Sequence, residues 1–223
     1  MFVKKANYII IAGGGRIGSH LAKTLVLEGR DVAVIESDSA TCEKLAGEVN
    51  ALVICGSATD KKALEDAGIQ RADVFAAVTG NDAENIVASQ LAKYSYKVPL
   101  VLARVEDMDR AKMLRHMGID LIISPSHVAA MAFENAIAVP GTTSILISET
   151  ITRAVEVSVP DNSKAVGKSI KDLDLPQDCV IAAIYRGAKL IIPHGGTVLK
   201  GDDIVALIGK DKAIIKAVDV LKG

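Results

Sequence analysis

The chain has 223 residues, half of them hydrophobic, and its 26 Lys and Arg side chains nearly balance 27 Asp and Glu side chains. This balance removes an electrostatic basis for nucleic-acid binding, and four Tyr and three Phe without Trp leave no platform for stacking single-stranded bases. Three scattered cysteines, Cys42, Cys55 and Cys179, indicate neither a disulfide framework nor a paired-cysteine metal site, which suits a reducing cytosol. The sequence shows no secretory signal and no apolar run of the roughly 18 residues that a membrane span needs.

Short β-branched runs alternate with helical patterns through the first part of the chain. The predicted strands are Tyr8–Ala12, Val32–Glu36, Leu52–Cys55, Val74–Val78, Leu100–Arg104 and Leu121–Ser124. The predicted helices lie near Ile17–Leu27, Ala40–Glu48, Lys61–Ala67, Glu84–Lys93 and Asp107–Met117. Strands separated by helices of this length predict an α/β fold with a Rossmann-like, doubly wound parallel sheet.

The alternation of strands and helices ends after Pro140-Gly141. The predicted strands are then Ala154–Val159, Cys179–Tyr185, Lys189–Ile192 and Ile204–Gly209, followed by a helix near Lys212–Leu221. Short strands joined at glycine turns predict a small α+β domain built mostly from hairpins. The sequence therefore predicts two domains, residues 1–140 and residues 141–223.

A glycine motif follows the first predicted strand. Gly13, Gly15 and Gly18 have the GxGxxG spacing at the start of a helix, where they would allow a tight turn, approach of a pyrophosphate and close helix–strand packing. Glu36 ends the second strand, where an acid accepts hydrogen bonds from a ribose diol. The context favours a nucleotide site over a merely structural turn. Ser37, with no Arg beside it, favours NAD(H) or a simple adenine nucleotide over NADP.

Arg16 lies at the mouth of the helix, where phosphate charge collects. It could contact phosphates bidentately, reach a nucleotide held by a neighbouring subunit, or be a solvated surface side chain.

The sequence shows no convincing set of catalytic residues. The histidines lie within helices or in loops without a partnered carboxylate nearby in sequence: His20, His116, His127 and His194. Tyr185 and Lys189 have a dehydrogenase-like YxxxK spacing, but this pair needs a helix and here falls in a predicted hairpin.

Three stretches carry a family resemblance. VICGSATDKKALEDAGIQRADVFAAVTGNDAENIVASQLAK, residues Val53–Lys93, resembles the third and fourth strands of RCK domains, which regulate potassium conductance. VEVSVPDNSKAVGKSIKDLDL (Val155–Leu175) and IYRGAKLIIPHGGTVLKGDDIVALIG (Ile184–Gly209) resemble the TrkA C-terminal domain. The two domains that they resemble would together span nearly the whole chain, and the pairing is specific because this tail occurs mainly on transport regulators.

The resemblance implies a cytosolic, non-catalytic subunit that gates a membrane-embedded potassium transporter in response to NAD(H) or ATP/ADP. The resemblance also implies that this subunit is associated peripherally with the membrane through the transporter. The implied cofactor-binding residues are Gly13, Gly15, Arg16, Ile17, Gly18, Glu36, Ser57, Ala58, Thr79, Gly80, Asn81, Asp82, Asn85 and Arg104. A purely structural interpretation of Thr79–Asp82 is a turn with Asp82 as the helix cap. Ser57 stands where many relatives have an acid. Ser124-Pro125-Ser126 replaces a His-Pro-Glu whose acid binds a cation in some relatives, so we predict no metal site.

The segment His127–Val139 is apolar almost all round, interrupted only by Glu134 and Asn135. A helix packed on one sheet needs a single apolar stripe, so this segment predicts burial on more than one side. RCK-like proteins join two subunits through a crossover helix at this place, which favours a homodimer as the unit of a larger ring. The alternative is a helix sandwiched between the two domains of one chain.

Two classes of function remain open at this point. The favoured one is the nucleotide-sensing gating subunit, and the alternative is a small NAD-dependent oxidoreductase whose catalytic residues escape these patterns. A weaker third interpretation is the detached cytosolic part of a channel.

Overall fold

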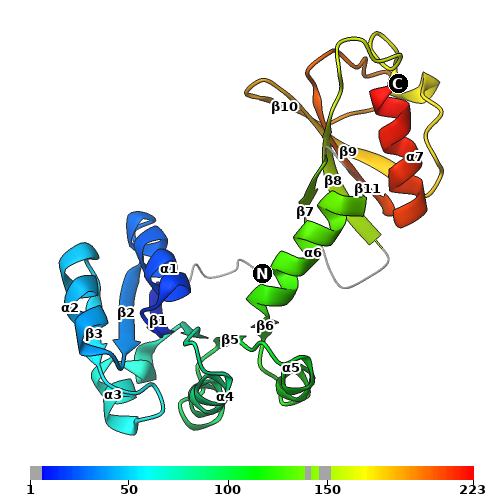
Figure 1. Cartoon of the computed structure of the whole chain (residues 1–223). Helices are drawn as coiled ribbons and strands as arrows, with labels where there is room; N and C mark the ends of the chain where they lie inside the picture. Colours follow the sequence, from blue (N-terminus) through cyan, green and yellow to red (C-terminus); the bar gives the residue numbers. More distant parts are fainter. Residues whose placement is uncertain (1–6, 139–141, 146–151) are drawn as a thin grey trace. The chain divides into compact units, whose positions relative to one another are not determined.

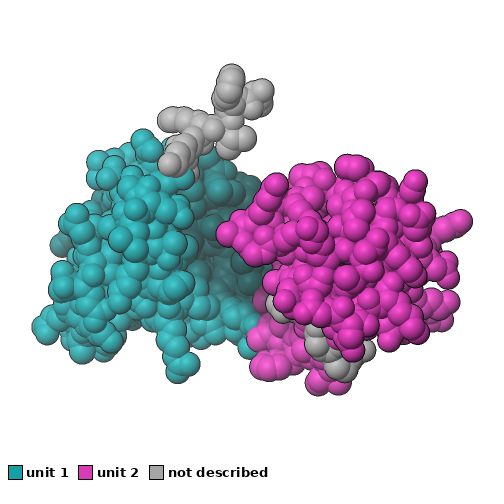
Figure 2. Space-filling model, turned by 90° about the horizontal axis from the view of Figure 1, so that it is seen from above, with its two compact units in different colours: residues 1–127 teal, residues 128–223 magenta. Residues whose placement is uncertain are grey.

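A computed structural model of the protein describes residues 7–138, 142–145 and 152–223. They divide into two compact units, Met1–His127 and Val128–Gly223, which Figure 2 shows in different colours. Each unit is described by itself. The predicted domain boundary between residues 140 and 141 lies outside the described residues and stays a prediction.

Unit 1 contains a six-stranded sheet in which every neighbouring pair of strands is parallel. The strand order is β3-β2-β1-β4-β5-β6. Figure 1 labels these strands except β4. The strands are β1 (Tyr8–Ala12), β2 (Asp31–Glu36), β3 (Leu52–Cys55), β4 (Val74–Ala77), β5 (Leu100–Arg104) and β6 (Leu121–Ile123). The predicted Rossmann-like sheet is confirmed, and its order reverses between β1 and β4.

Helices and short helical turns follow these strands. They are α1 (Arg16–Leu27), α2 (Ser39–Glu48), α3 (Lys61–Asp66), η1 (Ile69–Arg71), α4 (Asp82–Gln90), η2 (Leu91–Ser95), α5 (Met108–His116) and α6 (Pro125–Ala138). Four of them begin directly after a polar residue whose side chain accepts hydrogen bonds from the first turn: Asp38, Asp60, Asn81 and Asp107. Such caps satisfy amides that have no partner within the helix, which explains why these helices begin where they do.

The sheet of unit 1 is buried on both faces because successive strand residues point to opposite sides. In β1, Ile10 joins the core formed with α3, α4 and α5, whereas Ile9 and Ile11 join the core formed with α1 and α2. This double burial explains the near-continuous apolar runs in the sequence.

Unit 2 is built on a five-stranded antiparallel sheet in the order β10-β9-β11-β8-β7. Its elements are β7 (Thr142–Ile145), β8 (Thr152–Ser158), η3 (Ile170–Asp172), β9 (Cys179–Arg186), β10 (Lys189–Ile191), β11 (Ile204–Lys210) and α7 (Asp211–Lys222). The predicted hairpin of β9 and β10 is confirmed, and Lys189 pairs with Arg186 across it. Tyr185 and Lys189 therefore share no helix face. The edge strand β7 escaped the sequence analysis because four residues rich in Thr and Ser show no alternation.

One face of the unit 2 sheet is covered by α7. Ile214, Ala217 and Leu221 are fully buried and pack with sheet residues such as Val157 and Leu207. The spacing of these α7 residues follows one side of a helix, which is the amphipathic pattern that the sequence showed near Lys212–Leu221.

Candidate functional site

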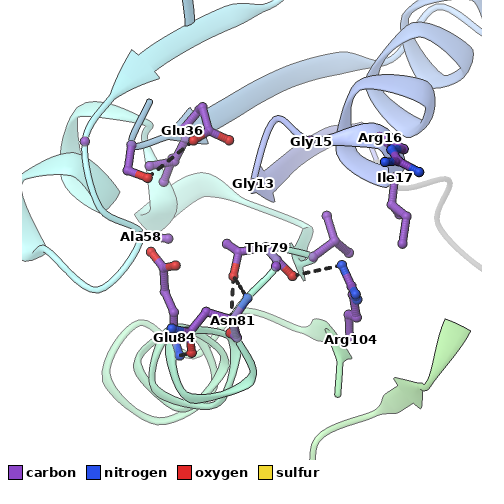
Figure 3. A pocket seen from close by; sticks show the side chains of 15 residues that line it. Gly13, Gly15, Arg16, Ile17, Glu36, Ala58, Thr79, Asn81, Glu84 and Arg104 are labelled. Atoms are coloured by element: carbon purple, nitrogen blue, oxygen red, sulfur yellow. Dashed lines mark hydrogen bonds between the residues drawn. The ribbon is translucent and has the colours of Figure 1, made fainter. Parts of the chain in front are cut away.

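A pocket of about 620 Å³ lies at the carboxyl edge of the parallel sheet (Figure 3). The loops after β1 and β4 diverge there because the strand order reverses between them, as expected for a ligand crevice in an open α/β sheet. The pocket is lined by Gly13, Gly15, Arg16, Ile17, Ile35, Glu36, Ser37, Gly56, Ala58, Val78, Thr79, Gly80, Asn81, Glu84 and Arg104.

The three glycines of the motif have different structural demands. Gly13 has φ +105°, and a Cβ atom built there would lie 2.8 Å from the backbone of Thr79. A Cβ atom on Gly18 would lie 1.8 Å from the carbonyl oxygen of Gly13. Gly15 has nothing within 4 Å of its Cβ position. Packing therefore requires glycine at two positions, whereas Gly15 leaves open space on the pocket side of the turn.

The start of α1 is arranged to receive an anion. Gly15 occupies the N-cap position of this helix and has no side chain that could accept a hydrogen bond from the first-turn amides. Those amides and the helix dipole favour negative charge. Arg16, the first residue of α1, is exposed and lines the pocket. These features suit a phosphate group.

Glu36 presents its carboxylate in the same pocket. Its Oε2 accepts a hydrogen bond from the Gly14 amide at 2.6 Å, and its Oε1 accepts one from the Asp38 amide at 2.8 Å. These two bonds hold the side chain at the end of β2 and tie it to the glycine turn. The carboxylate is a fixed acceptor of the kind that binds ribose hydroxyls.

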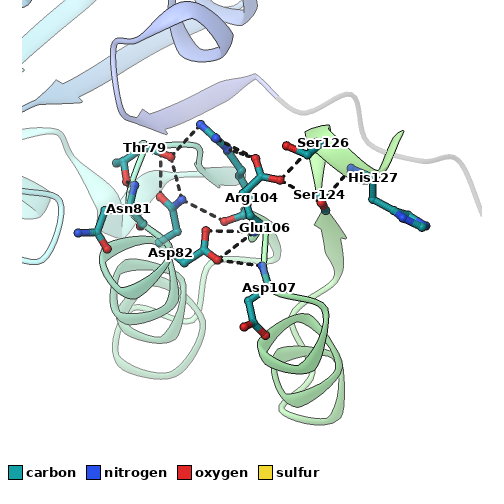
Figure 4. Close-up of polar contacts among 10 residues, drawn as sticks. Thr79, Asn81, Asp82, Arg104, Glu106, Asp107, Ser124, Ser126 and His127 are labelled. Atoms are coloured by element: carbon teal, nitrogen blue, oxygen red, sulfur yellow. Dashed lines mark hydrogen bonds and ion pairs between the residues drawn. The ribbon is translucent and has the colours of Figure 1, made fainter. Parts of the chain in front are cut away.

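The loop after β4 forms the opposite wall of the pocket. Thr79 Oγ1 accepts a hydrogen bond from the Asn81 amide at 3.2 Å, and the Asn81 side chain caps α4. The capping residue is thus Asn81, and the structural interpretation with Asp82 as the cap is wrong. Asp82 instead accepts hydrogen bonds from the amides of Glu106 and Asp107, so it faces away from the pocket (Figure 4).

Asn85 supports the pocket from behind. It is fully buried, its Oδ1 accepts a hydrogen bond from the Thr79 amide at 2.9 Å, and its Nδ2 donates to the carbonyl oxygens of Thr79 and Arg104, each at 3.0 Å. These contacts join the ends of β4 and β5. Because both polar atoms are used in this way, Asn85 shapes the pocket wall without lining it.

A polar chain connects the pocket to the start of α6 (Figure 4). Arg104 donates to the Thr79 carbonyl oxygen at 3.3 Å and forms an ion pair with Glu106 at 2.8 Å. The second carboxylate oxygen of Glu106 accepts hydrogen bonds from Ser124 Oγ and the Ser126 amide. Burial raises the pKa of Glu106, but the bonds from Arg104, Ser126 and Ser124 outweigh it and hold this pKa below its usual value.

The structure brings together most of the residues that the sequence singled out. Those that line the pocket are Gly13, Gly15, Arg16, Ile17, Glu36, Ala58, Thr79, Gly80, Asn81 and Arg104. Those that do not line it are Gly18, Ser57, Asp82 and Asn85. Gly18 is buried against Gly13, and Ser57 hydrogen-bonds Thr59 and Glu84. Whether any of these residues contacts a nucleotide stays a prediction.

Five lining residues were not among the predicted cofactor-binding residues: Ile35, Ser37, Gly56, Val78 and Glu84. Four of them are adjacent in the sequence to a predicted site residue. They lie at the ends of predicted strands or in the loops that follow, so the predicted strand ends already indicated their position. Glu84 is different, because it lies on α4 and its spacing from Asn81 resembles a helix-capping pattern.

The cysteines require a correction. The sequence analysis expected no disulfide framework, but Cys42 of α2 and Cys55 of β3 form a disulfide, with Cα atoms 6.0 Å apart. Their separation of 13 residues hid the contact, which arises because α2 packs back along β2 and β3. Cys179 is a free, buried thiol, and burial raises its pKa.

The described residues contain no group of three or more His, Cys, Asp or Glu side chains that could hold a metal ion. The prediction of no metal site remains a prediction. Among the helices of the described segments, none combines the length and apolarity needed to cross a bilayer.

Comparisons with known proteins match both units of the chain to domains of TrkA proteins. The TrkA-N domain model matches residues 9–125, and the TrkA-C domain model matches residues 154–222. A curated relative, the Trk system potassium uptake protein TrkA homolog of Methanothermobacter thermautotrophicus, is 38% identical over 210 residues, which is 94% of this chain and 97% of the relative.

Solved structures give the same fold. A structure described as the GsuK channel bound to NAD aligns with a TM-score of 0.67 at 19% identity, covering all of this chain and 40% of that chain. A structure of GsuK bound to ADP aligns with a TM-score of 0.51 at 26% identity, covering 59% of this chain and 34% of that chain. This chain thus spans less than half of each of these two solved chains.

Proposed function

The chain belongs to the TrkA family, and we propose that it is the nucleotide-sensing regulatory subunit of a potassium transport system. In this proposal NAD(H), ATP or ADP binds in the pocket of unit 1, and the protein gates a membrane-embedded potassium transporter from the cytosolic side. Membership of the TrkA family along both units supports a role in potassium transport. The geometry of the pocket supports the binding of a nucleotide.

One observation carries the nucleotide assignment. The uncapped start of α1 and the fixed carboxylate of Glu36 face the same pocket, so an anion-binding element and a hydroxyl-binding element lie together. A nucleotide presents phosphate and ribose in one molecule and matches this pair. Two aligned GsuK structures, one bound to NAD and one bound to ADP, support the same two ligand classes.

The composition of the pocket supports sensing in preference to catalysis. Its fifteen lining residues include two acids and two arginines but no His, which is the most frequent general acid and base, and no Cys or Lys nucleophile. An oxidoreductase using the same glycine turn is the competing function, and turnover distinguishes the two.

Calorimetry of the full chain with NAD, NADH, ATP and ADP tests the proposal. We expect at least one of these ligands to bind, and Glu36→Ala to weaken it by about 10- to 100-fold because roughly 1.5–3 kcal/mol of hydrogen bonding to a charged group is lost. Glu43→Ala is the control, since it removes an exposed acid from α2 outside the pocket.

Failure to bind any of the four ligands would contradict the proposal, and so would an unchanged affinity of Glu36→Ala. Oxidation of NADH with a substrate would support the oxidoreductase. Gating is measured as ligand-dependent potassium flux in proteoliposomes that contain the protein and a membrane potassium transporter of the same organism.

We further propose that two copies associate through α6, as the unit of a larger ring. Phe133 and Ile137 on this helix are 71% and 79% exposed. Large apolar side chains exposed on one helix favour contact with another protein surface. The last predicted residue of this segment, Val139, lies outside the described residues.

Size measurement by light scattering tests the dimer. The wild type is expected at about 46.8 kDa, twice the 23.4 kDa of one chain. Phe133→Asp should give the monomer, because a charge buried in an apolar interface is strongly unfavourable unless it is paired. Leu27→Asp changes a side chain that is 88% exposed on α1 and should leave the dimer intact. A wild-type monomer at micromolar concentration would rule out this assembly.

A further inference from the structure

Glu84 places a second carboxylate in the pocket. It lies in the first turn of α4, lines the pocket, and extends from this helix toward Ala58 (Figure 3). Ser57 Oγ, on the loop after β3, donates a hydrogen bond to Glu84 Oε1 at 3.3 Å. The side chain is therefore supported from the part of the pocket that lies beside Glu36, Gly56 and Ala58.

The orientation of Glu84 is not that of an ordinary helix cap. Asn81 is the N-cap of α4, and an acid three residues later commonly reaches back to the amide of the capping residue. Here the Asn81 amide donates to Thr79 Oγ1 at 3.2 Å, while the Glu84 carboxylate bonds to Ser57. The usual partner of this acid is already occupied, so its carboxylate is directed to the pocket.

The two acids of the pocket, Glu36 and Glu84, differ in how many further hydrogen bonds their carboxylates can accept. Both oxygens of Glu36 accept hydrogen bonds from backbone amides. For Glu84, in contrast, Oε2 accepts no hydrogen bond from the residues that the structure describes. A carboxylate is an acceptor with about four lone-pair sites, so Glu84 can take a donor from a ligand.

We propose that Glu84 is a specificity residue that accepts a hydrogen bond from the exocyclic amino group of adenine. The inference rests on the proposed nucleotide function and deepens it. In the proposed binding mode the phosphates lie at the start of α1 and the ribose at Glu36, so within ADP, ATP or the adenosine half of NAD the adenine amino group is the remaining N–H donor. Ser57 acts as a positioning residue that holds the carboxylate toward the base.

A thermodynamic cycle tests this contact. ADP is compared with purine riboside 5′-diphosphate, which lacks the amino group, on the wild type and on Glu84→Ala. On the wild type, loss of the amine should weaken binding by about 10- to 100-fold, the range for a hydrogen bond to a charged group. On Glu84→Ala, the two ligands should bind within about threefold of each other, because the acceptor is gone.

Glu43→Ala is the matched control, since it removes one negative charge outside the pocket and should discriminate between the ligands like the wild type. The inference would be overturned if the wild type and Glu84→Ala discriminated equally between ADP and the purine analogue. It would also be overturned if Glu84→Ala changed the discrimination between ADP and 2′-deoxy-ADP instead, because Glu84 would then contact the ribose. If the wild type binds neither ADP nor any of NAD, NADH and ATP, the proposed function itself fails. The two failures are therefore distinguishable.

Discussion

Gly15→Asp is expected to abolish nucleotide binding without unfolding the protein. A side chain fits at this position because nothing lies within 4 Å of its Cβ. Asp is a favoured N-cap residue, so its carboxylate would accept hydrogen bonds from the first amides of α1. The same amides are those proposed to hold phosphate. Loss of two charge-assisted bonds, at about 1.5–3 kcal/mol each, predicts weakening by more than about 100-fold.

Two further variants separate the effect of the introduced charge on phosphate binding from an effect on folding. Gly15→Asn has nearly the same size and capping ability but no charge, so any additional loss in Gly15→Asp reports repulsion of the phosphate. Gly18→Ala should behave differently and lower the unfolding temperature, because its methyl group would meet the carbonyl oxygen of Gly13. Calorimetry and thermal unfolding give the two readouts. Wild-type affinity of Gly15→Asp would show that phosphate binds elsewhere.

Asp203→Ala is expected to cost unit 2 about 3 kcal/mol of stability, the lower end of the range for breaking a buried ion pair. Asp203 is fully buried, and its oxygens accept hydrogen bonds from Arg186 Nε and Nη2, each at 2.7 Å, and from the Lys200 amide at 2.9 Å. The lower end applies because the Arg186 side chain is 32% exposed and can be hydrated. Denaturant unfolding, with hydrogen exchange of β9 and β11, measures the loss.

The pH dependence of this difference has a definite sign. Burial raises the pKa of Asp203, but the bonds from Arg186 and Lys200 outweigh it and hold the pKa below its usual 3.8. The contribution is therefore present above the unfolded pKa and is lost as pH falls below about 3.8 through the folded pKa. The stability gap between wild type and Asp203→Ala should shrink in that window.

Asp178→Ala is the control for this experiment. Asp178 pairs with Lys210 at 3.1 Å, but both side chains are more than half exposed, so its loss should cost less than about 1 kcal/mol. Equal losses for Asp178→Ala and Asp203→Ala would contradict a special role for the buried pair.

Local patterns in the sequence were sufficient for the first unit and its glycine turn. Parallel strands buried on both faces require continuous apolar runs, and the helices between them show their own period and caps. The positions of Gly13, Gly15 and Glu36 follow from strand ends alone, because every parallel strand delivers its carboxyl end to one edge. The chain order of motifs thus determined where a ligand crevice had to lie.

Only the tertiary structure decided how the side chains around that crevice are used. Asn85 and Asp82 became supports because their partners, Arg104 at the end of β5 and Glu106 in the loop after it, lie 19 and 24 residues away in the sequence. Glu84 turned to the pocket because Thr79 already occupies the Asn81 amide. Such choices depend on which donors meet across separate loops, and a hydrogen bond between distant residues leaves no period or spacing in the sequence.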